Sequence, residues 1–225
     1  MIYIDRAQAP APAAASWVSP DLATWSLLSG NSYDATAHAA STYTNNGGTM
    51  VGSGTHGEPN AAKDSGGIVS ADLGLTIADV RGIVVEVDIG TIPTTDTLFR
   101  GIGFAVINTN ALEDNKGAVL VPGRLSSGNY QAGTYKVGSN IVAATGVTGP
   151  WGKVVMSFPF TADGPATGSI VAKGATAVSV KDIDPALAAY DTGVRLALFY
   201  IRAQAGTNTA IAIPFSGLRY QVLTA

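Results

Sequence analysis

Two carboxylates, Glu86 and Asp88, alternate within the stretch GIVVEVDIG at residues 82–90. On a β-strand this spacing places both side chains on one face. Some β-sandwich glycosidases present their acid and nucleophile in this way, because a retaining hydrolase needs two carboxyl groups about 5 Å apart across the sugar ring. The solvent-facing side of an ordinary strand shows the same pattern, so both interpretations have to be weighed.

Other possible catalytic or ligand-binding motifs are incomplete. The string GSGTHG at 52–57 fits G-x-G-x-x-G, but EPNAAKDSGG follows it without a helical apolar period, which favours a glycine-rich loop over a nucleotide site. No G-x-S-x-G nucleophile elbow occurs anywhere in the chain. We therefore predict no catalytic residues and no cofactor.

Metal ligands are sparse. His38 and His56 are not spaced as a metal-binding pair, and the chain contains no cysteine. The loop TNALEDNKG offers oxygen ligands for calcium, namely Glu113, Asp114 and Asn115. This loop lacks the regular oxygen spacing of a dedicated site, so we predict no metal centre.

Aromatic rings outside the obvious strand cores could stack on the apolar face of a sugar. The candidate glycan-binding residues are Tyr33, Tyr43, Tyr130, Tyr135 and Trp151. Trp151 follows Gly149-Pro150 at a strand entrance, where either a core or a binding role is possible. We expect Trp17 and Trp25 to belong to the core.

Composition limits the possible partners. Hydrophobic residues make up 46% of the 225 residues, whereas charged residues make up only 13%, about half of the usual 25%. Between Met1 and Gly57 the chain has only four charged residues, and its net charge of −3 argues against nucleic-acid binding. A surface so poor in charge is best covered by neighbouring subunits. We predict a homo-oligomer, with a trimer favoured.

The N-terminal residues differ in kind from the rest. Residues 1–16 include AQAPAPAAAS, whose alternating prolines favour an extended arm, whereas residues 17–225 form a β domain in our interpretation. The first residues lack the features of a secretory signal, and no apolar run is long enough to span a bilayer. We therefore expect assembly in the cytoplasm and no membrane insertion.

From Thr49 onward, short apolar runs alternate with clusters of Gly, Asn, Asp, Ser and Thr, which is typical of an all-β sandwich. The pattern predicts strands with one buried face at 83–89, 102–106 and 154–160, and a central strand at 194–201 that is buried on both faces. A short helix or a turn is expected within residues 19–30, with Ser19 as N-cap and Pro20 at the first helical position. A second helix is expected at 184–190.

The order of several elements resembles the concanavalin A-like lectin/glucanase superfamily. The resemblance rests on DLATWSLLSG, GIVVEVDIG, GPWGKVVMSF, DTGVRLALFYIRAQ and IPFSGLRYQV. It implies an antiparallel jelly-roll sandwich. Glucanases of this superfamily carry E-x-D-x-E or E-x-D-x-x-E, but Gly90 and Thr91 stand where the last glutamate would be. The resemblance therefore implies that Glu86 and Asp88 are the polar face of a strand.

The superfamily includes lectins, glycosidases and attachment domains of bacteriophage virions. The arm, the low charge and the lectin-like pattern favour a non-catalytic structural and attachment protein on the surface of a phage or phage-like particle, assembled in the host cytoplasm. Its expected partners are itself, other virion proteins through the arm, and host-surface polysaccharide. The alternatives are a stand-alone carbohydrate-binding module or lectin and, less favoured, a polysaccharide-degrading enzyme.

Overall fold

The computed structural model describes residues 15–30, 40–52, 62–94, 99–107, 111–112, 117–125, 127–134, 142–147, 150–161, 164–165, 169–172, 178–179, 193–203 and 211–224. The first 14 residues of the predicted arm and the helix predicted at 184–190 lie outside these ranges. Among the described residues, no helix has the length and hydropathy needed to cross a bilayer.

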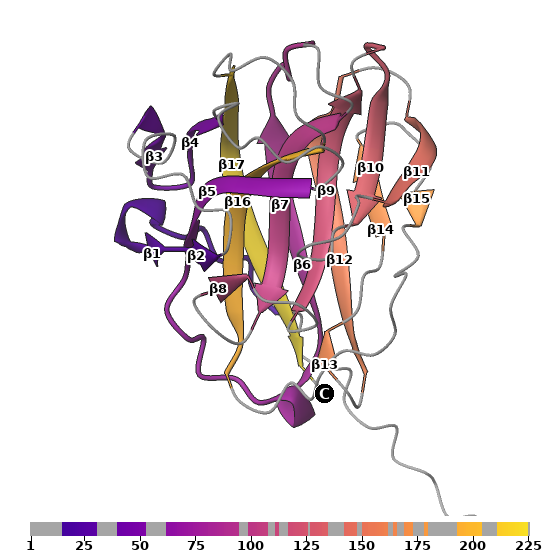
Figure 1. Cartoon of the computed structure of the whole chain (residues 1–225). Coiled ribbons are helices and arrows are strands. Elements are labelled where there is room, and N and C mark those ends of the chain that lie inside the picture. Colours follow the sequence, from indigo (N-terminus) through magenta and orange to yellow (C-terminus); the bar gives the residue numbers. More distant parts are fainter. Residues whose placement is uncertain are drawn as a thin grey trace, which may run out of the picture.

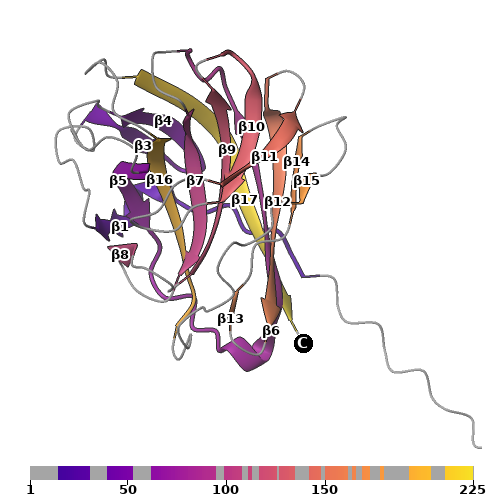
Figure 2. The same ribbon diagram turned by 45° about the vertical axis from the view of Figure 1, so that its right-hand side comes forward.

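Two antiparallel sheets face each other (Figures 1 and 2). The first has seven strands, in the spatial order β1 (Ser26–Leu27), β5 (Ala62–Val69), β16 (Arg195–Ala203), β7 (Phe99–Ile107), β9 (Gly117–Leu125), β10 (Tyr130–Thr134) and β11 (Val142–Val147). The second has eight, in the order β15 (Val178–Ser179), β14 (Ser169–Ala172), β12 (Gly152–Thr161), β6 (Val80–Ile89), β17 (Ile211–Thr224), β4 (Gly47–Gly52) and β3 (Thr42–Thr44), with β13 (Gly164–Pro165) beside β12. A short parallel pair joins β2 (Ser29–Gly30) to β8 (Ala111–Leu112).

The chain passes repeatedly between the two layers. Strand β6 is followed by β7 in the other sheet, β12 returns to the sheet of β6, and β16 and β17 again lie in different sheets. Strands distant in sequence therefore become neighbours, and β6 lies between β12 and β17. The predicted fold class, an all-β antiparallel jelly-roll sandwich, is confirmed.

The central strands differ in how many faces they bury. In β6 the predicted alternation is confirmed: Ile83, Val85, Val87 and Ile89 are buried, whereas Glu86 and Asp88 lie on the other face. In β7 every residue is buried, because Ile102, Phe104 and Val106 pack between the sheets while the alternate residues join a second apolar cluster. Strand β16 contributes to both clusters, which confirms the prediction of a central, doubly buried strand.

Proline and glycine mark the ends and bends of strands. Pro159 lies in β12 between Met156, which pairs with β14, and Phe160, which pairs with β13, and its partner among the described residues is Gly82 of β6. In β17 the register with β6 shifts between Ser216 and Arg219, and Gly217 adopts a φ of 63°. This bulge inserts one residue and reverses which side chains face the core.

The bulge explains a change of phase in the sequence of β17. Before it, Ile211, Ile213 and Phe215 face the core, at odd-numbered positions. After it the even-numbered positions take over, since Leu218 is buried and Tyr220 and Val222 pack against the same core. Arg219 consequently lies on the outer face, whereas an unbroken alternation would have directed it inward.

The segment before β1 forms a turn that leads into a strand, the second of the two structures expected there. A single 3-10 turn, η1 (Leu22–Thr24), precedes β1, and its N-cap is Asp21, whose Oδ1 accepts from the Ala23 amide at 3.2 Å. The predicted cap at Ser19 is wrong, because the helix is shorter than expected and begins after Asp21. A second 3-10 turn, η2 (Ile77–Asp79), leads into β6.

Candidate functional site

Glu86 is held between two cations on the outer face of the eight-stranded sheet. Its Oε1 lies 2.7 Å from the Nζ of Lys153 and 2.7 Å from the Nη2 of Arg219, and its side chain is only 12% exposed. Arg219 in β17 is directly opposite Glu86. Lys153 in β12 is opposite Asp88, which lies two residues from Glu86 on the same strand. The carboxylate is therefore paired on both sides by neighbouring strands.

The two cations decide the ionisation of Glu86. Partial burial opposes ionisation, but the hydrogen bonds and charges of Arg219 and Lys153 outweigh it and hold the pKa of Glu86 below its ordinary value. A general acid for glycoside cleavage needs a raised pKa, so that it carries a proton at neutral pH. The pKa of Glu86 is lowered instead, so its carboxyl group is ionised at neutral pH.

The positions directly opposite Glu86 hold no second carboxyl group; Asp88 lies two residues along the same face, opposite Lys153 and Ser216. The two positions directly opposite it are Val155 and Arg219. A Cβ at Gly90 would lie 2.6 Å from the Cγ of Pro214, so a glutamate could replace Gly90 only if Pro214 moved. Within the described part of this face, the geometry offers an ion-pair cluster where a glucanase needs a pair of acids.

Trp17, in the N-terminal segment, lies against one member of the cluster, Arg219. The Arg219 guanidinium lies 4.5 Å from the centroid of the Trp17 ring, and Trp17 is 38% exposed. The prediction that Trp17 belongs to the core is wrong, because Val18 pairs with Tyr220 at the free edge of β17 and directs the preceding residue onto the outer face. The structure thus gives this face an exposed indole next to a cation.

The sequence interpretation missed Lys153 and Arg219 as partners of Glu86. The polar face of residues 83–89 was visible, but pairing depends on which strands flank it, and these lie about 65 and 130 residues farther along the chain. The sequence did hold a signal for the position of Arg219. Apolar residues stand at odd positions before Gly217 and at even positions after it, and a glycine between two such series indicates a bulge.

The aromatic candidates have different surroundings. Trp151 is 1% exposed and its Nε1 donates to the Gly123 carbonyl at 2.8 Å, so it is a core residue and the proposal of a stacking role is wrong. Tyr130 is half-buried, with the Arg124 guanidinium 5.0 Å from its ring centroid. Tyr43 is half-buried in β3 and packs against the core. The structure does not bring these three together as one aromatic platform.

The remaining candidates lie outside the described residues: Tyr33, Tyr135, His38, His56, Glu113, Asp114 and Asn115. Most of the GSGTHG string does too, although Gly52 ends β4. In the part of the chain that the structure covers, no three His, Cys, Asp or Glu side chains gather in a way that could hold a metal ion.

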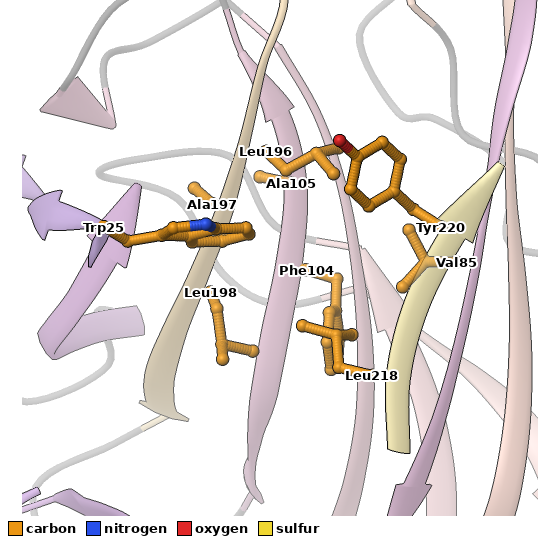
Figure 3. A pocket seen from close by; sticks show the side chains of 9 residues that line it. All are labelled: Trp25, Val85, Phe104, Ala105, Leu196, Ala197, Leu198, Leu218 and Tyr220. Carbon is orange, nitrogen blue, oxygen red and sulfur yellow. The ribbon is translucent and has the colours of Figure 1, made fainter. Parts of the chain in front are cut away.

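A small pocket lies between the two sheets and is lined almost entirely by carbon (Figure 3). Its empty space, including the mouth, is about 270 Å³. The lining residues are Trp25, Val85, Phe104, Ala105, Leu196, Ala197, Leu198, Leu218 and Tyr220. Trp25 and Tyr220 flank it on opposite sides, and burial raises the pKa of the Tyr220 hydroxyl. A pocket without convergent polar groups is unsuited to sugar binding or to acid–base chemistry.

Comparison with known proteins identifies similar folds only. No protein-family model matches the chain, and no curated protein matches it either. A similar solved structure is the carbohydrate recognition domain of Emp47p, with 10% identity, 95% of this chain and 99% of that one covered, and a TM-score of 0.47. Another is SCLam, a non-specific endo-β-1,3(4)-glucanase from family GH16, with 9% identity, coverage of 94% and 86%, and a TM-score of 0.43.

A third similar structure comes from a phage. It is the CBM2 module of the evolved Dit of Lactobacillus casei BL23 phage J-1, with 13% identity, coverage of 88% and 89%, and a TM-score of 0.39. These proteins include lectin-type and glucanase jelly rolls, as the resemblance in the sequence implied. At such identities and TM-scores below 0.5, the similarities carry no argument about what this chain binds or does.

Proposed function

We propose that this protein is a non-catalytic structural and attachment protein on the surface of a phage or phage-like particle, where it contacts host-surface polysaccharide. The observation that carries the non-catalytic part is the state of Glu86. Its carboxylate is paired with Lys153 and Arg219 at 2.7 Å each, and no second carboxyl stands opposite it. A retaining mechanism requires two carboxyl groups with separate roles.

The attachment part is supported by how the N-terminal segment joins the sandwich. The amide and carbonyl of Val18 exchange hydrogen bonds of 2.8 and 2.9 Å with Tyr220, and the Gln221 side chain donates to the Ala15 carbonyl. Residues 15–18 therefore lie along a sheet edge. An Ala/Pro-rich segment attached in this way is suited to contacting a neighbouring subunit.

The test separates binding from turnover. The purified protein is incubated with neutral and acidic polysaccharides, while retention of the protein and release of new reducing ends are measured. We expect retention without release, and no change in either for Glu86→Gln, because Glu86 lacks a catalytic partner. Release of reducing ends that Glu86→Gln abolishes, with the fold intact, would contradict the proposal and favour a polysaccharide-degrading enzyme.

We further propose a homotrimer in which the charge-poor N-terminal quarter contributes to the contact. Strand β3 forms one edge of the eight-stranded sheet, and Thr42 and Thr44 are exposed on it. An exposed edge without charged residues favours pairing with another copy. Thr42→Lys should therefore weaken assembly, whereas Ala78→Lys, which adds the same charge to exposed η2, should not.

Light scattering at micromolar concentration tests the assembly. A trimer that Thr42→Lys dissociates and Ala78→Lys preserves supports the virion role. A monomer that still binds polysaccharide would contradict the trimer and favour a stand-alone carbohydrate-binding module.

A further inference from the structure

Four basic residues occupy one cross-strand row of the seven-stranded sheet. Arg100 in β7 is directly opposite both Arg202 in β16 and Arg124 in β9, and Arg202 is in turn opposite Lys63 in β5. The row thus crosses four adjacent strands at a single register position. It contains four of the 13 Lys and Arg residues of the whole chain.

Basic residues at neighbouring register positions need partners. Like charges directly opposite each other on a sheet destabilise it unless other groups compensate them, and a buried guanidinium needs such groups because it loses its hydration. Arg100 is only 2% exposed. The whole chain is poor in charge and has a net charge of −3, so the row is a local feature and not part of a generally basic surface.

Of the two row members whose side chains the structure describes, Arg124 is the one that reaches solvent, whereas Arg100 is buried. Arg124 is partly exposed, its Nε donates to the Gly128 carbonyl at 3.0 Å, and its Nη1 donates to the Ile92 carbonyl at 2.7 Å. Its guanidinium lies over the Tyr130 ring. Two of its five N–H donors are used in these bonds, which leaves three to meet an anion.

The surroundings of Arg124 are suited to a sugar. The turn between β9 and β10 exposes Ser127 and Asn129, whose side chains can exchange hydrogen bonds with hydroxyl groups. Tyr130 adds a half-buried ring at the same place, and Gly128 permits the turn with a φ of 91°. A guanidinium and an aromatic ring therefore lie together at one end of the sandwich, beside a turn that exposes two polar residues.

We infer that this end of the sandwich binds an acidic polysaccharide through its carboxylate or phosphate groups. Arg124 receives the anionic group through its remaining N–H donors, and Tyr130 lies beside the sugar ring. The inference rests on the proposed function, because it names the class of polysaccharide that the attachment protein contacts.

The test measures affinity for polygalacturonate, which supplies carboxylates, for a phosphate-bearing teichoic acid, and for neutral dextran and laminarin. We expect at least one acidic polymer to bind more tightly than the neutral ones, with affinity falling as salt is raised. Arg124→Gln should weaken acidic binding about tenfold, since it removes a charge-assisted contact. The acidic polymer that binds identifies which anionic group is recognised.

Arg81→Gln is the matched control. Arg81 is exposed near the start of β6, whereas Ile92, which Arg124 contacts, follows the end of that strand, so the control removes the same charge far from the row. It should leave acidic binding unchanged. Arg124→Lys keeps the charge and should retain the salt-sensitive preference for acidic polymers at reduced affinity, which tests the site if Arg124→Gln folds poorly.

Two results would overturn the inference: equal affinity for acidic and neutral polymers, or an equal loss of acidic binding in Arg124→Gln and Arg81→Gln. Binding of neutral polymers alone would leave the proposed attachment function standing and remove only this site. If no polysaccharide in the panel is bound, both the attachment function and the inference fail.

Discussion

Two arginines of this protein each lie over an aromatic ring, but one is paired with a carboxylate and the other with backbone carbonyls. Arg219 lies 4.5 Å from the Trp17 centroid on the outer face of the eight-stranded sheet, and Arg124 lies 5.0 Å from the Tyr130 centroid at one end of the seven-stranded sheet. Arg219 pairs with the Glu86 carboxylate, whereas Arg124 donates to two backbone carbonyls. The first charge is neutralised, and the second is held in place without being neutralised.

This difference indicates which region is available to a charged ligand. On the outer face, Lys153 and Arg219 already share a carboxylate, so an incoming anion would compete with Glu86. In the Arg124 region, carbonyl groups orient the guanidinium and leave its full charge to act on a partner. Whether an arginine is available to an anion therefore depends on its partner: a carboxylate neutralises the guanidinium, whereas backbone carbonyls only orient it.

The largest expected effect comes from deleting Ser216 and Gly217 together. Phe215 would then be followed directly by Leu218, so that Leu218 would turn outward and Arg219 would turn into the core. We expect loss of the cooperative unfolding transition in circular dichroism, which corresponds to more than about 4 kcal/mol. Gly217→Ala is the control: no atom crowds the added Cβ, but the positive φ should cost about 1 kcal/mol. Equal effects of the two changes would contradict a role for the bulge in register.

The next effect tests how Arg124 is held. Arg124→Met keeps much of the side-chain volume but leaves the Ile92 and Gly128 carbonyls without their donor. Losing these bonds should lower the free energy of unfolding by about 2 kcal/mol, as measured by urea denaturation. A change below about 0.5 kcal/mol would show that the carbonyls do not depend on the guanidinium.

Removing the charge of Glu86 should have a smaller effect. Glu86→Gln leaves Lys153 and Arg219 side by side without a shared carboxylate, but both cations are partly exposed to solvent. We expect a loss of about 1 kcal/mol or less at neutral pH, with a smaller difference from the unchanged protein at high salt. A double-mutant cycle with Arg219→Gln would show a coupling near zero if the ion pair contributes nothing.

The smallest effect is the pH dependence of the same pair. The pKa of Glu86 is lower in the folded state than its ordinary value of 4.5, so its ionisation stabilises the fold above that pH, and this contribution is lost as the pH falls through the lowered pKa. Glu86→Gln should therefore cost stability at pH 7 and progressively less below about pH 4.5. Urea denaturation of both proteins across this range measures the difference, and parallel curves would contradict it.

Much of the architecture follows from local patterns. Alternation at 83–89 predicts which side chains are buried in β6, and the apolar run at 194–201 predicts a doubly buried β16. These features depend on the two-residue period of a strand, which any short segment reveals. The candidate site depends on more distant relations. The sequence pattern predicts the wrong environment for Trp17 and leaves Trp151 open between a core and a binding role, because burial depends on what packs over a residue.

What the sequence determined by itself is the class of fold and the two faces of its main strands, since hydrophobic periodicity is a local property. Only the tertiary structure decided that Arg219 and Lys153 flank Glu86, and that Lys63, Arg202, Arg100 and Arg124 share one row. These neighbours come from strands far apart in the chain, and a bulge of one residue at Gly217 is enough to change which face a side chain occupies. The charge pattern depends on register, and register is set only when the sheets assemble.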